Sequence, residues 1–302
     1  MSGTAVRFEV LDRANGTGPI PIDAARFAAI AAAHEGLLHI LAVEEAYDIL
    51  VLNHVELERG LFDQALSDMM FPSAERVTME KGRRDIDRRI ANLLSSGRMF
   101  VDHQKRVSTA VFGKGSPEAK AVDHSIQRHG ETWPGFRATE ALRNYVQHCG
   151  LPVGSWTRSG SWIEDPAKGG RLRHSFSVAF APDGLRATRL IDKSVLSVLD
   201  ARRDGSGLVP LLPMLREYTM GMSYVIEDFR SGIDAKFREW SLALAIELQQ
   251  FAVAAGGVEP QGAVALAFDA AGRTAQMVAL QFDVEERLAD LQERNRRLTN
   301  LH

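Results

Sequence analysis

A chain of 302 residues, of which 45% are hydrophobic and 25% are charged, can bury the core of one large domain or of two ordinary ones. The formal net charge of −3 excludes a basic surface that covers the whole protein, but it leaves room for a local basic cleft. The single cysteine, Cys149, excludes an internal disulfide framework and a zinc site built on cysteine thiolates.

The N-terminal part of the chain carries no sign of a targeting or membrane segment. No run of about twenty consecutive apolar residues occurs, and the first residues lack a basic stretch followed by an apolar one. The apolar segment near residue 28 is rich in alanine and is interrupted by His34, Glu35 and His39. We therefore expect a soluble cytoplasmic protein with no membrane partner.

The first part of the chain predicts one strand and then a series of helices. Apolar residues alternate over residues 6–10 and an Asn-Gly turn follows, a pattern typical of a strand. Asp23 is a suitable N-cap for an alanine-rich helix that we expect to end at about Leu41. Apolar residues at helical spacing then predict one helix over residues 43–70 and another over residues 78–112.

Two shorter helices are indicated by residues at their ends. Ser116 and Pro117 are of the types found at an N-cap and at a first helical position, so we expect a helix to start there. A second amphipathic helix follows it. Gly150 and Pro152 form a conventional stop signal just past the end of that second helix.

Beyond residue 153 the hydrophobic period changes from that of a helix to that of a strand. Apolar residues alternate over residues 176–180, and we expect 182–184 to be a turn between two short strands. The helical period returns over residues 213–255, with Gly232 as a candidate break. Residues 262–282 then predict a second hairpin.

The C-terminal helix is expected to start at residue 283. Its apolar positions and one polar position alternate in steps of four and three: Val284, Leu288, Leu291, Asn295 and Leu298. Such steps are typical of a heptad seam with a polar residue at one core position, but two heptads are too few for an independent coiled coil. Two interpretations stay open: a tail helix docked on its own chain, which we favour, and self-association.

These elements predict a mainly α (α+β) fold, a helical bundle with a small accessory antiparallel β-sheet. We divide the chain into an N-terminal strand and helix, a bundle with a β-hairpin insertion at about 153–208, and a C-terminal hairpin and tail helix: residues 1–42, 43–256 and 257–302. The strands at residues 6–10, 176–180 and 264–268 are candidates to pair in one small sheet.

The helix before Gly150 ends in a group of residues suited to phosphate chemistry. Asn144 and His148 are four apart and share a helix face, and Arg143 lies about 140° around the helix from His148. Arginine binds phosphoryl oxygens in bidentate fashion, and a histidine can move a proton to or from a ribose hydroxyl. The alternative is an ordinary polar helix end, where a terminal histidine caps carbonyl groups.

The run from Arg143 to His148 resembles the signature of the HEPN superfamily. In that signature an arginine is commonly followed by a polar residue such as asparagine, and a histidine stands four to six residues further on. Here Asn144 follows the arginine and His148 comes four residues later. The resemblance covers mainly residues 43–150 and the helices of 209–256, and it implies a HEPN-like helical bundle.

The resemblance also implies a function, a metal-independent endoribonuclease without a cofactor. Arg143 would bind and polarise the scissile phosphate, His148 would act as general acid or base, and Asn144 would orient the phosphate or the histidine. The product would be a 2′,3′-cyclic phosphate. Many members of the family belong to bacterial anti-phage defence or toxin–antitoxin systems, so we expect an RNA substrate, a homodimer with a composite cleft, and an antitoxin or sensor protein as partner.

A second function remains open on the same resemblance. Some members have lost catalysis and only bind nucleotide, RNA or a protein partner. Other members carry a tyrosine two residues beyond the histidine that a partner enzyme modifies. Gly150 stands at that position here, so no such modification is implied.

Basic residues near the motif are candidates to bind the RNA backbone. Arg84 and Arg88 share a helix face within a cluster of five basic residues, which Asp85 and Asp87 partly neutralise. Arg137 adds positive charge near the motif in sequence. A solvated, charged helix face is the default alternative for all three arginines.

The histidines at positions 103, 124 and 129 do not predict a metal site. His124 and His129 are five apart, and two ligands on one helical face would be four apart. We therefore expect no metal at these residues and assign them to a solvated helix face.

Overall fold

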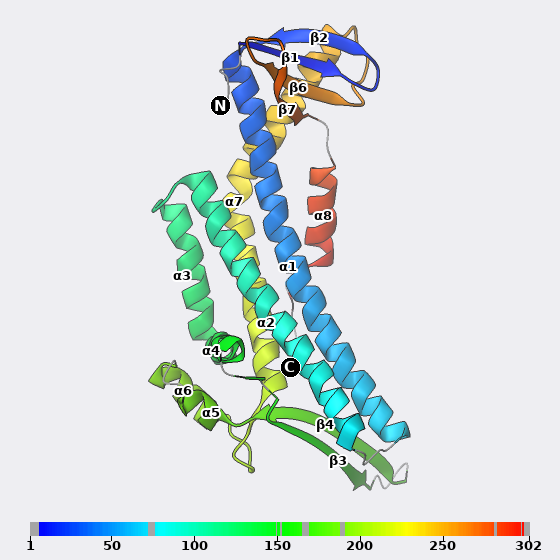
Figure 1. Ribbon diagram of the computed structural model, residues 1–302, viewed down its shortest axis with the longest axis vertical. Helices are drawn as coiled ribbons and strands as arrows, with labels where there is room; N and C mark the ends of the chain where they lie inside the picture. The colour runs from blue at the N-terminus through cyan, green and yellow to red at the C-terminus, as the bar shows by residue number, and fades with distance from the viewer. Residues whose placement is uncertain are drawn as a thin grey trace.

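The computed structural model describes residues 6–71, 76–148, 150–151, 153–164, 169–187, 191–280, 283–296 and 298. Three long helices run side by side along the molecule (Figure 1): α1 (Ala24–Met70), α2 (Arg76–Phe112) and α7 (Leu211–Ala254). A small antiparallel sheet lies at each end of this bundle. The described chain is mainly helical with minor β structure, which confirms the predicted mainly α (α+β) class.

Helix α1 is continuous over 47 residues, or about 70 Å at 1.5 Å per residue. Asp23 caps it as expected, since its carboxylate accepts a hydrogen bond from the backbone N–H of Arg26 at 2.7 Å. The predicted end near Leu41 is wrong. No glycine, proline or capping residue interrupts the chain there, and Leu41 and Val43 are buried in the same core. The domain boundary predicted at residue 42 therefore falls inside this helix.

By length and composition alone, α1 is also the one helix of the described residues that could cross a membrane. Half of its most apolar segment is buried inside the protein, and core helices of soluble proteins can pass the same test of length and composition. Gly36 contributes to that burial: a Cβ atom there would lie 2.5 Å from the Trp240 ring, so α7 approaches the backbone of α1 closely. Helix α7 continues through Gly232, so the candidate break is wrong.

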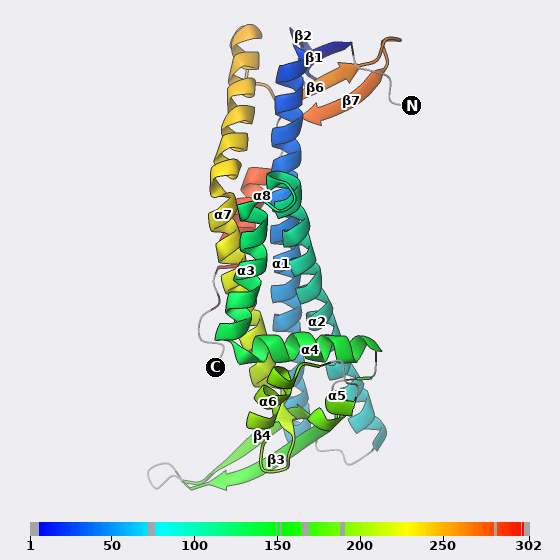
Figure 2. The same ribbon diagram turned by 90° about the vertical axis from the view of Figure 1, so that its left-hand side faces the viewer.

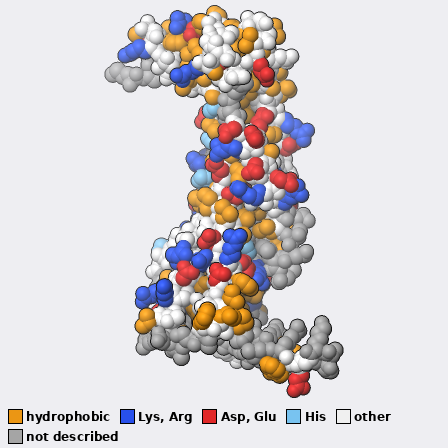
Figure 3. All heavy atoms as spheres, turned by 90° about the vertical axis from the view of Figure 1, so that its right-hand side faces the viewer, with side chains coloured by type: hydrophobic (Ala, Val, Ile, Leu, Met, Phe, Trp, Pro, Cys, Tyr) orange, Lys and Arg blue, Asp and Glu red, His pale blue; other side chains and the backbone are white. Residues whose placement is uncertain are grey.

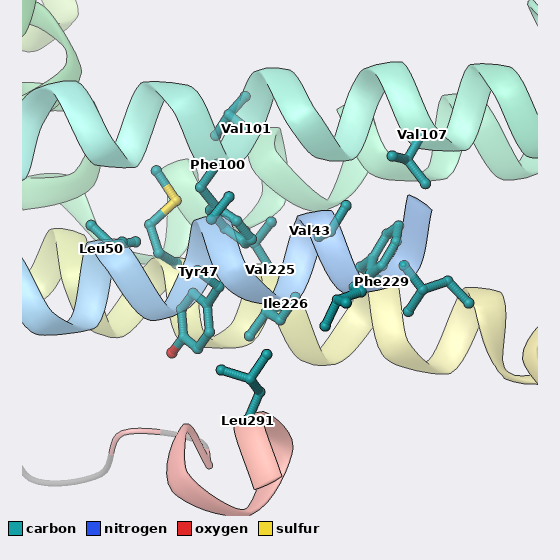
Figure 4. Close-up of a cluster of buried hydrophobic side chains, with 14 of the residues drawn as sticks. Val43, Tyr47, Leu50, Phe100, Val101, Val107, Val225, Ile226, Phe229 and Leu291 are labelled. Carbon is teal, nitrogen blue, oxygen red and sulfur yellow. The ribbon is translucent and has the colours of Figure 1, made fainter. Parts of the chain in front are cut away.

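The core lies between the three long helices. Figure 4 shows Tyr47 of α1, Phe100 of α2, and Val225 and Ile226 of α7 directed toward one another. The rings of Tyr47 and Phe100 have centroids 5.2 Å apart, and each of the four side chains is at most 1% exposed. Because fully burying one such side chain contributes about 1.5–3 kcal/mol, this cluster holds the helices together.

Two shorter helices, α3 (Pro117–Thr132) and α4 (Pro134–His148), follow α2. The hydroxyl of Ser116 accepts a hydrogen bond from the backbone N–H of Ala119 at 3.1 Å, which confirms the predicted cap. Helix α3 packs on α2 and α7, whereas α4 lies across the long axis of the molecule (Figure 2). The stop predicted at Gly150 is confirmed, since α4 ends two residues before it.

Both terminal segments build the sheet at the start of α1. Its order is β2-β1-β6-β7, and its strands are β1 (Arg7–Asp12), β2 (Thr17–Ile22), β6 (Ala263–Phe268) and β7 (Thr274–Ala279). Strand β1 pairs antiparallel with both β2 and β6, with Val10 opposite Ala265. The predicted pairing of residues 6–10 with 264–268 is confirmed, and so is the second hairpin.

The second sheet lies at the other end of the bundle and has the order β3-β4-β5. Its strands are β3 (Ser155–Ile163), β4 (Arg171–Phe180) and β5 (Val209–Pro210). The predicted strand at 176–180 is confirmed as part of β4, but its pairing with the terminal sheet is wrong because the bundle separates the two sheets. The turn expected at 182–184 is also wrong. Those residues begin a short helix, α5 (Pro182–Ala187), which α6 (Lys193–Ala201) follows.

The C-terminal helix α8 (Val284–Arg294) packs along α1, which confirms a tail helix docked on its own chain. Glu44 of α1 is fully buried, and its two carboxylate oxygens accept hydrogen bonds from Arg230 of α7 at 2.8 and 2.7 Å. Asn295, the polar residue of the predicted seam, donates to Asp48 of α1 at 2.7 Å, and its backbone carbonyl accepts from Arg230 at 3.3 Å. This network joins α1, α7 and the C-terminal segment.

Substitution of Glu44 by alanine removes the carboxylate that pairs with Arg230. The Arg230 guanidinium, which is mostly buried, then lacks this partner. We expect the free energy of unfolding, measured by urea denaturation, to fall by about 3–5 kcal/mol. Glu45→Ala is the matched control. Both side chains of its pair with Arg287 are exposed, so its loss should stay below about 1 kcal/mol. Figure 3 shows charges of both signs interspersed over one face of the molecule. Equal losses would contradict a structural role for the buried pair.

Candidate functional site

Packing against α7 fixes the position of α4. The backbone N–H of Gly135 donates to Glu217 Oε2 of α7 at 2.7 Å. The ring of Phe136 lies 5.2 Å from that of Tyr218, also on α7. Leu142 is fully buried, so contact with the bundle extends nearly to the end of the helix. In the last turn of α4, Gln147 and His148 are exposed, whereas Tyr145 and Val146 are half-buried against the core.

The three residues of the predicted motif lie in this terminal part of α4. Asn144 and His148 are exposed, one helical turn apart, and Arg143 is half-buried. Arg143 Nη1 donates a hydrogen bond to Asn144 Oδ1 at 3.1 Å. Its Nε is buried and has no hydrogen-bond partner among the described residues. In the described part of the chain the guanidinium therefore contacts the amide and not the imidazole, and one of its donors is left unused.

A buried hydrogen bond lies behind the motif. The hydroxyl of Tyr218, a fully buried residue, donates to Glu140 Oε1 of α4 at 2.8 Å. Burial, with the negative charge of Glu140 in addition, holds the pKa of Tyr218 well above its usual value, so the phenol stays protonated. The positive charges of Arg143 and Arg98 act in the opposite direction, toward a lower pKa of Tyr218.

Helix α2 leaves space for the same hydrogen bond at Gly97. A Cβ atom at Gly97 would lie 2.1 Å from the Tyr218 hydroxyl oxygen, so only glycine leaves room there. Neither Glu140 nor Gly97 was predictable from the sequence as part of this site. Three helices meet at this point, and hydrophobic periodicity does not report which side chains face each other across helices.

Two arginines expected to bind RNA are ion-paired on α2. Arg88 Nη2 lies 2.8 Å from Asp85, and Arg84 Nε lies 3.8 Å from Glu80. Neighbouring arginines are paired in the same way: Arg83 with Asp87, and Arg89 with Asp85 and Glu56. These contacts neutralise much of the basic cluster, and they are the contacts expected of a solvated, charged helix face.

Arg137, the third arginine expected to bind RNA, contacts helix α6. Its Nη2 donates to Ser194 Oγ of α6 at 3.1 Å. Arg137 and Glu140 line a cavity of about 450 Å³ between α3, α4 and α6, which does not include Arg143 or His148. The described structure thus does not bring the three RNA-binding candidates together around the motif.

His103, His124 and His129, which we assigned to a solvated helix face, have three different environments. His124 is exposed, as expected for a solvated face. His103 Nδ1 lies 3.4 Å from the carbonyl oxygen of Ala42. His129 is buried and its Nε2 lies 2.9 Å from Asp228 Oδ2 of α7, so its assignment to a solvated face is wrong. Across the described residues, no group of three or more histidine, cysteine, aspartate or glutamate side chains could hold a metal ion.

Comparison of the chain with models of protein families, with curated proteins and with solved structures finds no match. The residues and geometry of the chain itself therefore carry the functional argument. They offer an exposed histidine and a half-buried arginine at the end of one helix, and an amide that contacts the arginine.

Two helical glycines give a matched test of how closely α2 approaches the Tyr218–Glu140 hydrogen bond. Gly97→Ala should lower the free energy of unfolding by about 1–3 kcal/mol, because the new methyl group would displace the Tyr218 ring. Gly232→Ala should raise it by about 0.5–1 kcal/mol, because its Cβ meets nothing within 4 Å and alanine favours the helix. Chemical denaturation measures both, and a stabilising Gly97→Ala would contradict the close contact.

Proposed function

We propose that the protein is a metal-independent endoribonuclease whose reacting groups are Arg143 and His148. The observation that carries this proposal is the arrangement at the end of α4. The Arg143 guanidinium contacts the Asn144 amide at 3.1 Å, and His148 is exposed one turn further along the helix. Together with the resemblance to the HEPN signature, this arrangement offers a cation for a phosphate and a group that moves protons.

The chemistry requires two proton transfers. One imidazole accepts the proton of a ribose 2′-hydroxyl, whose oxygen then attacks the adjacent phosphorus. The bond to the 5′-oxygen breaks, an imidazolium gives that oxygen a proton, and the products are a 2′,3′-cyclic phosphate and a 5′-hydroxyl. Arg143 would stabilise the charge that develops on the phosphoryl oxygens, and Asn144 would hold the guanidinium or the phosphate in place.

A homodimer would supply the second imidazole. One chain brings a single His148, on the exposed end of α4, whereas the mechanism uses one base and one acid. A second copy of the chain facing the first across this helix end would form a composite cleft with two histidines and two arginines. On the resemblance alone, we assign such an enzyme to the cytoplasm and to bacterial anti-phage defence or a toxin–antitoxin system, under the control of an antitoxin or sensor protein.

A specific observation favours a second candidate, a non-catalytic HEPN-like module that binds nucleotide, RNA or a protein partner. Arg143 contacts Asn144 and not His148 within the described residues. The arginines of the neighbouring helix face are engaged by carboxylates, among them Asp85 and Asp87. A surface of this kind binds RNA less strongly than an unpaired basic groove, because fewer phosphate counterions are released.

A cleavage assay in excess EDTA separates the two candidates. Purified wild type, His148→Ala and Arg143→Ala are incubated with a mixed RNA pool, and Gln147→Ala serves as the control for an exposed substitution on the same turn. We expect cleavage by the wild type and the control, and a loss of at least about 100-fold in each motif variant, the typical contribution of general acid–base catalysis.

Each remaining outcome of this assay decides against the ribonuclease at this site. Cleavage that persists in both motif variants would mean that the end of α4 is only a polar helix end. RNA binding by the wild type without cleavage, lost in Arg143→Ala, would favour the binding module.

A further inference from the structure

A separate cavity of about 400 Å³ lies between α2, α3 and α7. These three helices are neighbours along the bundle (Figures 1 and 2). Its lining includes residues of all three: Gln104, Ser108, Val122, Val225, Phe229 and Gly232. It contains no residue of α4, so it is distinct from the Arg143–His148 motif. Cavities of this size are large enough for a small molecule.

The buried lining of the cavity is apolar except at Gln104, Ser108 and Ser125. Val122, Val225, Phe229 and Ile233 line it and are buried. Gln104 of α2 also lines it and is fully buried. Its Nε2 donates to the carbonyl of Val225 at 3.4 Å, but its Oε1 has no hydrogen-bond partner among the described residues. A buried carbonyl oxygen without a donor is unfavourable, so this oxygen is a ready acceptor for a ligand.

Asp228 and Arg128 both line the cavity and pair with each other, and two further lining residues, Glu118 and His124, are exposed. Asp228 of α7 accepts hydrogen bonds from Ser125 and Arg128 of α3, and His129 Nε2 lies 2.9 Å from the same oxygen. Burial acts to raise the pKa of Asp228, but these three donors outweigh it and hold that pKa below its usual value. A carboxylate with three donors does not require a cation from a ligand. Every buried side chain that lines the described cavity is uncharged, so the occupant that suits its interior is neutral.

Gly232 keeps one side of the cavity open. It lines the cavity from within the continuous helix α7, and a Cβ atom built there would meet nothing within 4 Å. Glycine is disfavoured inside a helix relative to alanine. Gly232 is exposed, so the missing side chain leaves free space at the solvent-facing part of the cavity, which a larger residue would occupy.

We propose that this cavity binds a neutral, largely apolar small molecule, about the size of two fused rings, through a hydrogen bond that it donates to Gln104 Oε1. The apolar lining supplies most of the contact, and the unpaired Gln104 oxygen sets the orientation of the ligand. This site does not depend on the proposed ribonuclease activity, because it shares no residue with the motif.

Indole and benzofuran test the proposal as a matched pair, because they share a shape and only indole carries an N–H donor. Titrations of the full-length protein are followed by saturation-transfer NMR and calorimetry. We expect indole to bind the wild type about tenfold more tightly than benzofuran, because only indole satisfies the buried oxygen. Gln104→Leu should remove this preference while both compounds still bind.

Gly232→Leu tests the location, since its side chain would fill the cavity. We expect it to abolish binding of both compounds, whereas Gly232→Ala should retain binding. Melting curves show whether each variant is folded. If Gln104→Leu does not fold, Gly232→Leu still tests whether the compounds bind in this cavity. Absence of indole binding to the wild type, equal affinity for the two compounds, or binding that persists in Gly232→Leu would each overturn the proposal.

Discussion

The long contact between α1 and α7 is the constraint on which the rest of the structure depends. Helices of 47 and 44 residues are stabilised mainly by packing of their apolar faces and only weakly by helix propensity, so the two must stay in contact over much of their length. Their length separates the two sheets (Figure 1). It also provides the surfaces on which α3, α4 and α8 pack, and thereby fixes the positions of the motif and of the cavity.

Polar groups buried in this bundle differ in how well they are satisfied. Glu44 has both oxygens engaged by Arg230, and the Tyr218 hydroxyl has the Glu140 carboxylate. Buried groups of this kind are normally paired, because an unpaired one loses its hydrogen bonds to water without replacement. Gln104 Oε1 departs from that rule beside a cavity, and this departure is why the cavity, although remote from the motif, is relevant to function.

Local signals predicted much of the fold, and their limits explain the errors. The cap at Asp23 was predictable because capping is an interaction within four residues. The break expected near Leu41 was wrong because a change in alanine content is not a stop signal, and Pro182 began a helix because proline also favours the first helical turn. The sequence placed Arg143 at a helix end. It did not reveal that its guanidinium contacts Asn144, since tertiary packing sets side-chain direction.

The central claim is that the end of α4 cleaves RNA without a metal ion, and the chemistry of the RNA ends tests it most directly. Mass spectrometry of fragments produced by the wild type in EDTA distinguishes the two main routes of cleavage. Attack by the 2′-hydroxyl predicts fragments that end in a 2′,3′-cyclic phosphate and begin with a 5′-hydroxyl. Fragments with 3′-hydroxyl and 5′-phosphate ends would contradict the assignment of Arg143 and His148, because water and not the ribose would then be the nucleophile.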